Sequence, residues 1–459
     1  MNKLQTIDTK ENFKLMEERI HYIMNINELT HDIHNELKGI EQDGYYCVLD
    51  EETFNTIPFG ERWYVKYYPT YHMSVLLVQY YVNGHKEIYD DMMKTLNECV
   101  NRKYLGHSYD NHSIALNYLI KLYKAGIASF MYDSELGKQI DDIVRYYRER
   151  LANNQTSEGF GNLEEQIKEL LSLVDDDLLF VYGTLMRDEI SHYMLEDALY
   201  LGDCIINGYG LVEVDGYPGM IDSDSYVSGE VYKINNSIKH KLDIYEDDEY
   251  TYESEYITLD GLAYHVHFYK YILEEHRKYV PSYTRDGRWL DVRNYVWYAS
   301  YGSNVLDIRM NKYIDNTYSK LPYVYQRNII INHPIYFALR SRKWNNMGIC
   351  FLDTSKQGMS FGRMYLITKD QFSEIMQQEG SAYNLAYKIS QDELGVDIMT
   401  ITSSTHYDDT KPSIEYLEVI GAGIQQAYHL ETSDIINYLG YYNELDLSSE
   451  HINTILLDK

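Results

Sequence analysis

The stretch Leu178–Leu185, which reads LLFVYGTL, is an apolar run that ends in a turn of Tyr, Gly and a polar residue. A second stretch, Tyr295–Leu306 (YVWYASYGSNVL), repeats this arrangement and turns at Tyr301–Asn304. A short apolar run that is closed by a glycine turn is typical of a buried β-strand. The chain therefore carries one strand-and-turn pattern twice.

The two copies also agree in the segments downstream of each turn. A Gly-x-x-Tyr segment comes later in both, as Gly229–Tyr232 (GEVY) and as Gly362–Tyr365 (GRMY). A glutamate then lies 17 residues after each of these glycines, at Glu246 and at Glu379. Two unrelated motifs would not keep both order and spacing, so we infer an internal duplication.

Both copies resemble the γ-glutamyl cyclotransferase-like family. Its features are an apolar strand ending in Tyr-Gly-Thr-Leu or Tyr-Gly-Ser-Asn, a later Gly-x-x-Tyr strand and a single catalytic glutamate. The first copy matches further through Asp215–Gly219 (DGYPG) and through Leu242–Glu246 (LDIYE) followed by Tyr250. The second copy matches the Tyr-Gly-Ser-Asn branch, with its glutamate in Gln377–Gly380 (QQEG) followed by Tyr383. The resemblance implies the family fold, a small mixed β-barrel with flanking helices.

The residues before the first copy have a helical pattern. Apolar side chains recur at helical spacing in Met73–Tyr81, Tyr89–Leu96 and Ala115–Tyr123. The polar stretch Asn153–Gly161 predicts a linker, and one more helix is expected at Leu163–Leu173. This part of the chain is therefore predicted to be all-α.

Short strands and few helices are expected within the two copies. Tyr264–Phe268 alternates like a half-buried strand, whereas Ile329–Ile331 and Ile349–Leu352 have the pattern of buried strands. Helices are expected at Asp188–Ala198, after the first turn, and at Lys369–Gln378, before Glu379. This mixture indicates an α+β protein without alternating βαβ units.

These observations predict three domains, which agrees with the number of about three that 459 residues would suggest. A helical N-terminal domain is expected at 1–173. Two tandem small mixed β-barrel γ-glutamyl cyclotransferase-like domains follow, at 176–284 and at 293–446.

Charge and cysteine usage exclude several classes of protein. The formal net charge is −30, so the surface repels phosphate backbones and anionic membranes, and neither a nucleic-acid nor a membrane partner is expected. The four cysteines are scattered, which argues against a disulfide framework or a structural zinc site and for a reducing compartment. The first residues lack the apolar stretch of a signal peptide, and no run of about eighteen apolar residues exists. A cytoplasmic protein is expected.

The resemblance implies an intramolecular aminolysis. In the family, the α-amine of a γ-glutamyl group attacks its own γ-carbonyl, closes 5-oxoproline and expels the attached amine. One carboxylate can accept the proton of the attacking amine and then protonate the leaving amine. The resemblance assigns this catalytic role to Glu246 and Glu379, and the substrate is then a small γ-glutamyl compound. The reaction needs no metal or cofactor, and none is expected.

The alternative for each glutamate is a solvated carboxylate at the end of a helix. It is the better interpretation of Glu246 taken alone, because that residue begins the acidic run Glu246–Glu249, but the matched spacing favours the functional one. We further hypothesise that the acidic neighbours raise the pKa of Glu246 relative to that of Glu379.

The two turns are the candidate substrate-binding elements. A glycine at a strand end lets the backbone turn sharply, and consecutive N–H groups form a small anion cradle that would hold the α-carboxylate of the glutamyl group. The hydroxyls of Thr184 and Ser303 and the amide of Asn304 can add hydrogen bonds. The alternative to a binding element is a turn that only ends a strand. The predicted binding residues are Tyr182, Gly183, Thr184, Leu185, Tyr301, Gly302, Ser303 and Asn304.

Two other constellations are set aside. His31 and His34 lie three residues apart near Glu36, but this spacing is common on helices and does not by itself indicate a metal site. Gly106–Asp110 contains His, Ser and Asp in adjacent positions, whereas a catalytic triad is assembled across space.

A second class of function stays open beside the enzyme. The same folds could hold a small γ-glutamyl-like ligand without turnover, as a binding or regulatory protein. The helical domain is expected to recruit a partner or a substrate carrier, or to mediate self-association. The leaving amine and the number of active copies are not determined by the sequence.

Overall fold

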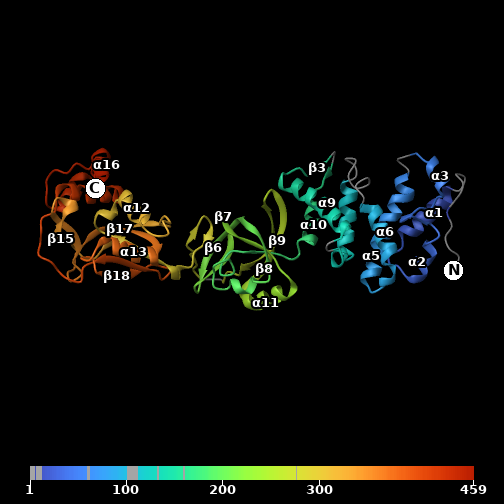
Figure 1. The fold of residues 1–459 in the computed structure, drawn as a ribbon, viewed down its shortest axis with the longest axis horizontal. Helices are drawn as coiled ribbons and strands as arrows, with labels where there is room; N and C mark the ends of the chain where they lie inside the picture. Colours follow the sequence, from blue (N-terminus) through green and yellow to red (C-terminus); the bar gives the residue numbers. More distant parts are fainter. Residues whose placement is uncertain are drawn as a thin grey trace. The chain divides into compact units, whose positions relative to one another are not determined.

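The computed structural model describes residue 6 and residues 13–58, 62–100, 112–131, 134–158, 161–274 and 277–458. Helices dominate the N-terminal part, and mixed sheets with fewer helices come after it (Figure 1). The run Gly106–Asp110 lies outside the described residues. Within the described residues, no helix has the length and apolar character that crossing a membrane requires.

The chain divides into two compact units. The first unit comprises Met1–Val181, Leu185–Ile206 and Gly229–Ile272. The second unit comprises Tyr182–Thr184, Asn207–Ser228 and Leu273–Lys459.

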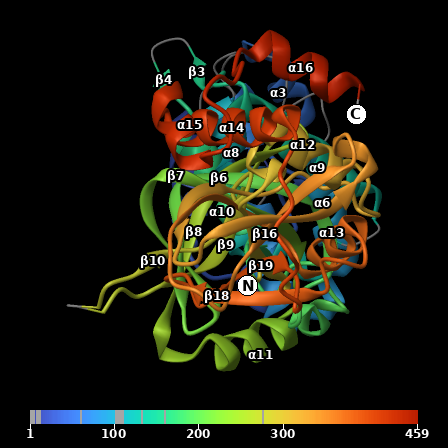
Figure 2. The same cartoon turned by 90° about the vertical axis from the view of Figure 1, so that its left-hand side faces the viewer.

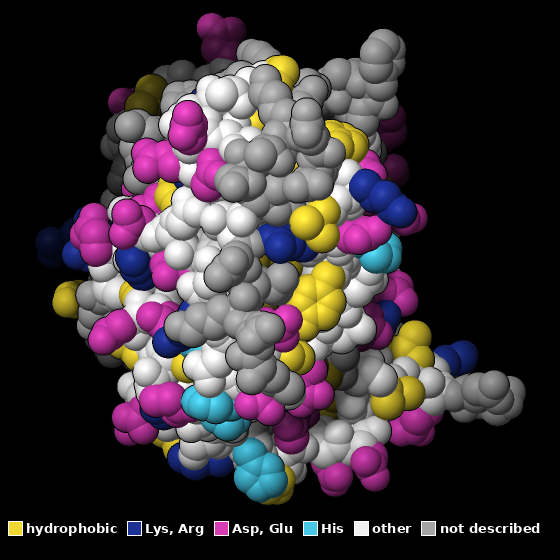
Figure 3. All heavy atoms as spheres, turned by 90° about the vertical axis from the view of Figure 1, so that its right-hand side faces the viewer, with side chains coloured by type: hydrophobic (Ala, Val, Ile, Leu, Met, Phe, Trp, Pro, Cys, Tyr) yellow, Lys and Arg dark blue, Asp and Glu magenta, His cyan; other side chains and the backbone are white. Residues whose placement is uncertain are grey.

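The first unit begins with a bundle of helices, as the apolar periodicity predicted. The stripe Met73–Tyr81 lies in α5 and the stripe Ala115–Tyr123 in α8, and most of their apolar side chains are buried. The described helices of this part are α1 (Phe13–Met24), α2 (His31–Leu37), α3 (Glu51–Thr56), α5 (Tyr68–Val82), α6 (Tyr89–Val100), α8 (His112–Lys124), α9 (Glu135–Ala152) and α10 (Glu164–Val174). Figure 3 shows Asp and Glu side chains distributed over one face of the molecule, interspersed with Lys and Arg.

The predicted linker Asn153–Gly161 is not simply irregular. It contains β3 (Ser157–Glu158), which pairs antiparallel with β4 (Gly161–Asn162) in a short hairpin. The backbone N–H of Leu163 donates to the carbonyl of Thr156 (2.9 Å), which ties the end of the hairpin to its beginning. Helix α10 then starts directly after Leu163.

A six-stranded mixed sheet comes next. Its strands are β5 (Leu178–Val181), β6 (Leu199–Val214), β7 (Tyr217–Lys233), β8 (Tyr250–Leu259), β9 (Leu262–Tyr271) and β10 (Val280–Pro281), in the order β10-β6-β7-β5-β9-β8. The predicted apolar strand is β5, which pairs antiparallel with β7 and parallel with β9. The first Gly-x-x-Tyr segment lies in β7, and Tyr264–Phe268 lies in β9, as expected. Helix α11 (Asn236–Glu246) connects β7 to β8.

The helix predicted at Asp188–Ala198 is wrong. Only a short 3₁₀ turn, η5 (His192–Leu195), forms there. Asp188 has φ of +69°, in the left-handed region, which a right-handed helix cannot include. The backbone of the preceding Arg187 is instead held by a side chain of β7.

The helical part and the sheet share one hydrophobic core in the first unit. Ala263 of β9 is buried among the helical side chains, and Tyr256 of β8 packs against them while its hydroxyl donates to the carbonyl of Lys168 (2.8 Å). A buried ion pair joins the same elements. Arg148 of α9 donates to the carboxylate of Asp175 (2.7 Å) and to the carbonyl of Ala263 (2.8 Å). The two charges satisfy each other where water is excluded.

The second unit contains a five-stranded mixed sheet. Its strands are β13 (Tyr295–Ser300), β14 (Gln326–Ile331), β17 (Ser360–Thr368), β18 (Leu385–Gln391) and β19 (Asp397–Thr402), in the order β14-β17-β13-β19-β18. The central strand β13 pairs antiparallel with β17 and parallel with β19, as β5 does with β7 and β9. The strand order around the two apolar strands is therefore the same. This agreement supports the inferred duplication.

Helices cover both faces of this second sheet. They are α12 (Asp307–Asp315), α13 (Lys369–Glu379), α14 (Ile414–Tyr428), α15 (Thr432–Leu439) and α16 (Ser449–Asp458). Trp297 and Ala299 of β13 point into a core with α14, α15 and α16, which lie together in Figure 2. Val296 and Tyr298 point into a second core with α12 and α13. Alternate residues of β13 thus face opposite cores, so apolar side chains occupy both faces of the strand.

Two short hairpins also lie in the second unit. β11 (Thr284–Arg285) pairs with β12 (Arg288–Trp289), and β15 (Ile335–Ser341) pairs with β16 (Met347–Leu352). The predicted strand Ile349–Leu352 lies in β16 and is largely buried. Ile329–Ile331 forms part of β14, but only Ile331 is buried, because β14 is an edge strand of the sheet.

The fold class is confirmed at the level of a mixed α+β protein with a helical N-terminal region. The tandem barrels and the boundaries at 1–173, 176–284 and 293–446 stay predictions.

The Arg148–Asp175 pair allows a test of how the first unit is held together. Arg148→Met leaves Asp175 as a buried, unpaired charge, so the free energy of unfolding is expected to fall by about 3–5 kcal/mol. The measurement is urea unfolding followed by circular dichroism. The matched control is Arg145→Met on the same helix, whose exposed pair with Glu149 is expected to contribute less than about 0.5 kcal/mol. Equal effects of the two substitutions would contradict the prediction.

Candidate active site

The turn of the second copy is anchored at the end of β13. The hydroxyl of Tyr301 donates to the carbonyl of Ile401 in β19 (2.8 Å), so the first residue of the turn is fixed to the neighbouring strand. A 3₁₀ turn, η8 (Ser303–Val305), then leads into α12. Asn304 is buried in this turn, with 3% of its surface exposed.

Helix α13 brings Glu379 to the same place. Its N-terminus is capped reciprocally by Thr368 and Gln371, and Glu379 is its last residue. The side-chain amide of Asn304 donates to Oε1 of Glu379 (2.7 Å), and the hydroxyl of Tyr313 donates to Oε2 (3.1 Å). Both carboxylate oxygens are thereby oriented by neutral donors.

A small cavity of about 30 Å³ lies at this carboxylate. It is bordered by the whole predicted turn, by Glu379 and by the ends of several strands. The lining residues are Tyr298, Ser300, Tyr301, Gly302, Ser303, Asn304, Cys350, Glu379, Tyr383, Ile401 and Tyr416. The structure therefore brings together all five site residues that the sequence predicted for the second copy.

One polar atom in the wall of the cavity has no hydrogen-bond partner among the described residues. Oδ1 of Asn304 is buried and forms no hydrogen bond within the described part of the chain. An unpaired buried acceptor costs free energy, so its retention here suggests a donor that binds in the cavity.

Burial raises the pKa of the Glu379 carboxyl above its usual range. The donors Tyr313 and Asn304 and the positive charge of Arg309 act in the opposite direction and lower the pKa, but they do not cancel the loss of water. A carboxyl with a raised pKa is suited to both accept and donate a proton near neutral pH.

The turn of the first copy is packed against the β6–β7 hairpin. A Cβ on Gly183 would lie 2.4 Å from Cγ of Pro218, so only glycine fits at this position. The backbone N–H of Met220 donates to the hydroxyl of Tyr182 (3.4 Å). The matched stretch Asp215–Gly219 thus supplies the residues that cover the turn. Asp215 and Gly216 both have positive φ, as a tight two-residue hairpin requires.

Glu246 is the last residue of α11, as Glu379 is of α13. Burial raises the pKa of its carboxyl to about 7. The hypothesis that its acidic neighbours raise this pKa is wrong, because burial is the cause of the shift and the charges of the run Asp247–Glu249 do not contribute to it. The nearby carboxylate of Glu246 contributes, after burial, to the raised pKa of Tyr250.

The predicted site residues of the first copy are divided between the two units. Thr184 and Leu185 are buried, as is Tyr182. Tyr182–Thr184 belong to the second unit, whereas Leu185 and Glu246 belong to the first. A joint site of these residues stays a prediction.

Several residues of the second site were not predicted. Tyr313, Tyr416 and Cys350 contact the cavity or Glu379, and each lies far from Glu379 in the sequence. The hydroxyl of Tyr383, the tyrosine that follows the glutamate in the second copy, donates to the carbonyl of Cys350 (2.8 Å), and Tyr383 borders the cavity. In the part of the chain that the structure describes, no three His, Cys, Asp or Glu side chains are grouped so that they could hold a metal ion.

Comparisons with known proteins found a matching family and several relatives. The family described as "Gamma-glutamyl cyclotransferase, AIG2-like" matches residues 179–291. The "Putative gamma-glutamylcyclotransferase" of Vibrio cholerae serotype O1 is 34% identical over 114 residues, which are 24% of this chain and 94% of that protein. The γ-glutamylcyclotransferase family protein YtfP of Escherichia coli K12 is 37% identical over 65 residues, which are 14% of this chain and 58% of that protein.

Two of the solved structures that were found align with larger parts of the chain. YkqA from Bacillus subtilis aligns with 61% of this chain and 98% of its own, at 20% identity and a TM-score of 0.25. A structure described as γ-glutamyl cyclotransferase aligns with 36% of this chain and 99% of its own, at 18% identity and a TM-score of 0.28. The match to the Vibrio cholerae protein extends over nearly the whole of that relative, and on this ground the chain belongs to the γ-glutamyl cyclotransferase family.

Proposed function

We propose that this chain releases 5-oxoproline from a γ-glutamyl amine, amino acid or peptide by intramolecular aminolysis. Glu379 would be the acid and base of the second copy, and Glu246 that of the first. The observation that carries the proposal is the Glu379 carboxylate, which Asn304 and Tyr313 hold at a small cavity beside a Tyr-Gly-Ser-Asn turn. Family membership supports the same reaction.

The proposed reaction needs one carboxylate and little else. The substrate's α-amine is tethered to its own γ-carbonyl, so the entropy of bringing the two groups together is largely prepaid. Glu379 takes a proton from the amine as the new C–N bond forms. It then gives that proton to the departing nitrogen as the old C–N bond breaks. Its raised pKa supports both steps near neutral pH.

The Tyr301–Asn304 turn would bind the α-amine and the α-carboxylate of the glutamyl group. Oδ1 of Asn304 is an acceptor without a partner among the described residues, and an α-amine is a donor of the right kind. Because the same side chain donates to Glu379, Asn304 would hold the amine next to the carboxylate that deprotonates it. The backbone N–H groups near Gly302 would then receive the α-carboxylate.

The leaving amine is best sought among small γ-glutamylated compounds. One relative, described as "Gamma-L-glutamyl-butirosin B gamma-glutamyl cyclotransferase" of Niallia circulans, is 36% identical over 70 residues, which are 15% of this chain and 45% of that protein. We therefore include γ-glutamylated biosynthetic amines in the substrate class, beside γ-glutamyl amino acids and peptides. The cytoplasmic location and a partner for the helical region stay expectations.

The alternative is a binding protein that holds the same ligands without turnover. The unpaired acceptor of Asn304 fits a ligand as well as a substrate. Replacing both glutamates with glutamine separates the two proposals, because it removes turnover while binding and cellular function would persist in a binding protein.

Substitution of the two glutamates tests the proposed chemistry. Glu379→Gln keeps the shape of the side chain but removes the base, so 5-oxoproline release by the second copy is expected to fall by at least about 100-fold. Glu246→Gln is expected to do the same to the first copy. The measurement is 5-oxoproline release from a panel of γ-glutamyl compounds by the wild type, both single variants and the double variant. Full activity in the double variant would refute the assignment.

A second prediction concerns the cavity itself. A methyl group on Gly302 would lie 3.5 Å from the Tyr416 hydroxyl and 3.6 Å from Cβ of Cys350, which are ordinary contacts. Gly302→Ala is therefore expected to fold while it occupies the wall of the cavity, and KM of the second copy is expected to rise at least about tenfold. The contrast is Gly183→Ala, which is expected to destabilise the fold because of the 2.4 Å clash with Pro218. Unchanged KM in folded Gly302→Ala would place the substrate elsewhere.

A third prediction concerns pH. Glu246 must be ionised to accept a proton, and its pKa is raised to about 7, so release by the first copy is expected to decline as the pH falls through about 7. Burial causes the shift, so Asp247→Asn with Asp248→Asn should leave this acid limb in place. The measurement is the pH dependence of kcat/KM in a Glu379→Gln background, where the substrate's own amine titrates identically in both proteins. An acid limb that moves to lower pH would assign the raised pKa to like charges.

A further inference from the structure

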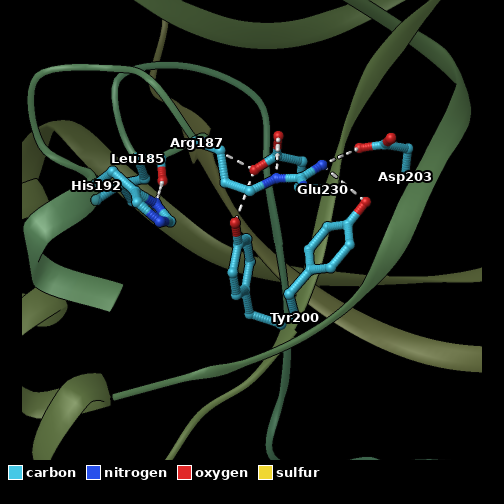
Figure 4. A network of polar contacts seen from close by, with 7 residues as sticks. Leu185, Arg187, His192, Tyr200, Asp203 and Glu230 are labelled. Carbon is cyan, nitrogen blue, oxygen red and sulfur yellow. Dashed lines mark hydrogen bonds and ion pairs between the residues drawn. The ribbon is translucent and has the colours of Figure 1, made fainter. Parts of the chain in front are cut away.

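In the first copy, a buried carboxylate holds the segment that comes after the turn. Glu230 of β7 is completely buried. It accepts hydrogen bonds from the backbone N–H of Arg187 (2.8 Å), from Nε of the same residue (3.4 Å) and from the hydroxyl of Tyr232 (2.8 Å). Figure 4 shows Arg187 reaching Glu230, with Tyr200 and Asp203 also bonded to its guanidinium. The segment after the turn is thereby fixed on the Gly-x-x-Tyr strand.

In the second copy, the same two elements are joined with the charges exchanged. Arg363 of β17 is buried and donates to the carboxylate of Asp307, the first residue of α12. The hydroxyl of Tyr365 donates to the carbonyl of Asn304 (2.9 Å) and to Oδ1 of Asp307 (3.3 Å). The carboxylate now belongs to the segment after the turn, and the arginine belongs to the strand.

The positions correspond in the two copies. Glu230 and Arg363 each come directly after the glycine of Gly-x-x-Tyr, and the motif's tyrosine donates to the carboxylate in both. Arg187 lies four residues after the glycine of its turn, and Asp307 lies five residues after its own. A change of one partner alone would leave an uncompensated buried charge. The exchange of both charges preserves the ion pair between the strand and the segment after the turn.

We propose that Tyr365, Arg363 and Asp307 form a positioning clamp for Glu379, and that Tyr232, Glu230 and Arg187 form its charge-exchanged counterpart. The role in catalysis rests on the proposed function. The segment that the clamp holds carries both donors to the carboxylate of Glu379, which are the Asn304 amide and the Tyr313 hydroxyl. The clamp residues act on Glu379 through the backbone of Asn304 and the start of α12.

Loss of the clamp has a defined effect on the proton chemistry. Asn304 and Tyr313 lower the pKa of Glu379, so a looser segment raises that pKa and moves the acid limb of activity to higher pH. Among the described residues, several titratable and charged groups interact with Glu379. They are Arg309 and Tyr313 of α12, Lys343 of η9 (Arg342–Trp344), Tyr298 of β13, and Tyr301, Tyr383 and Tyr416. Substitutions in the clamp leave all of these groups in place.

The first test is Tyr365→Phe, which removes only the hydroxyl that joins Asn304 and Asp307. In a Glu246→Gln background, kcat of the second copy is expected to fall about tenfold with KM nearly unchanged, and the acid limb is expected to move to higher pH. The matched control is Tyr442→Phe, which removes a hydroxyl that donates to the carbonyl of Pro412. Kinetics and a pH profile of Tyr365→Phe that equal those of the background would overturn the clamp.

The second test reproduces the exchange between the copies. Asp307→Arg and Arg363→Glu are each expected to lower kcat more than Tyr365→Phe does, because each leaves two like charges in contact. The double variant carries the residue types of the first copy and is expected to recover at least about tenfold over either single variant. A folded double variant with no recovery would overturn the proposal, and if it does not fold, Tyr365→Phe decides.

A third readout separates the clamp from the proposed function. If the wild type releases no 5-oxoproline from any compound, the proposed function fails. The clamp is then judged by the pKa of Glu379, measured in the full chain by carbon-13 NMR with Glu379→Gln identifying the signal. A higher pKa in Tyr365→Phe supports the clamp, and an unchanged pKa overturns it.

Discussion

Strand β13 constrains the rest of the second sheet, because it is held on four sides. β17 and β19 pair with its two edges, and its alternate side chains fill two separate cores. A shift of one residue would exchange the side chains of the two cores, so the register is fixed. The place where β13 ends therefore determines where the Tyr301–Asn304 turn begins. That turn in turn determines where Asn304 can meet the end of α13.

The same constraint explains why the sequence predicted so much of the second site. A strand buried on both faces is a continuous apolar run, and its abrupt end at Tyr301-Gly302 is visible without a structure. Helix α13 has a capping pair and an apolar face, so its extent was also predictable, to within one residue. Glu379 at its last position then followed from spacing. Each of these features depends on residues that are close together in the sequence, so the sequence alone predicts it.

The residues that were missed depend on contacts between distant segments. Tyr313 lies 66 residues before Glu379, and with 50 tyrosines in the chain nothing distinguishes it in the sequence. The false helix at Asp188–Ala198 has a related origin. Its composition permits a helix, but Asp188 adopts a positive φ, and the backbone N–H of Arg187 is bonded to Glu230 of β7. The acidic run after Glu246 predicted the wrong cause for the raised pKa of this residue. Burial of the carboxyl raises the pKa, and the number of charges nearby in the sequence does not.

The core that the helical part shares with the first sheet extends beyond the region that the family match covers. The family match begins at residue 179, yet Ala263 and Tyr256, which lie inside the matched region, are covered by helices that lie outside it. The segment that the family match covers and the segment that shares this core are thus different stretches of the polypeptide. In this chain the helices complete the core on one face of the sheet. The N-terminal region therefore cannot be exchanged as a separate module without redesign of β8 and β9.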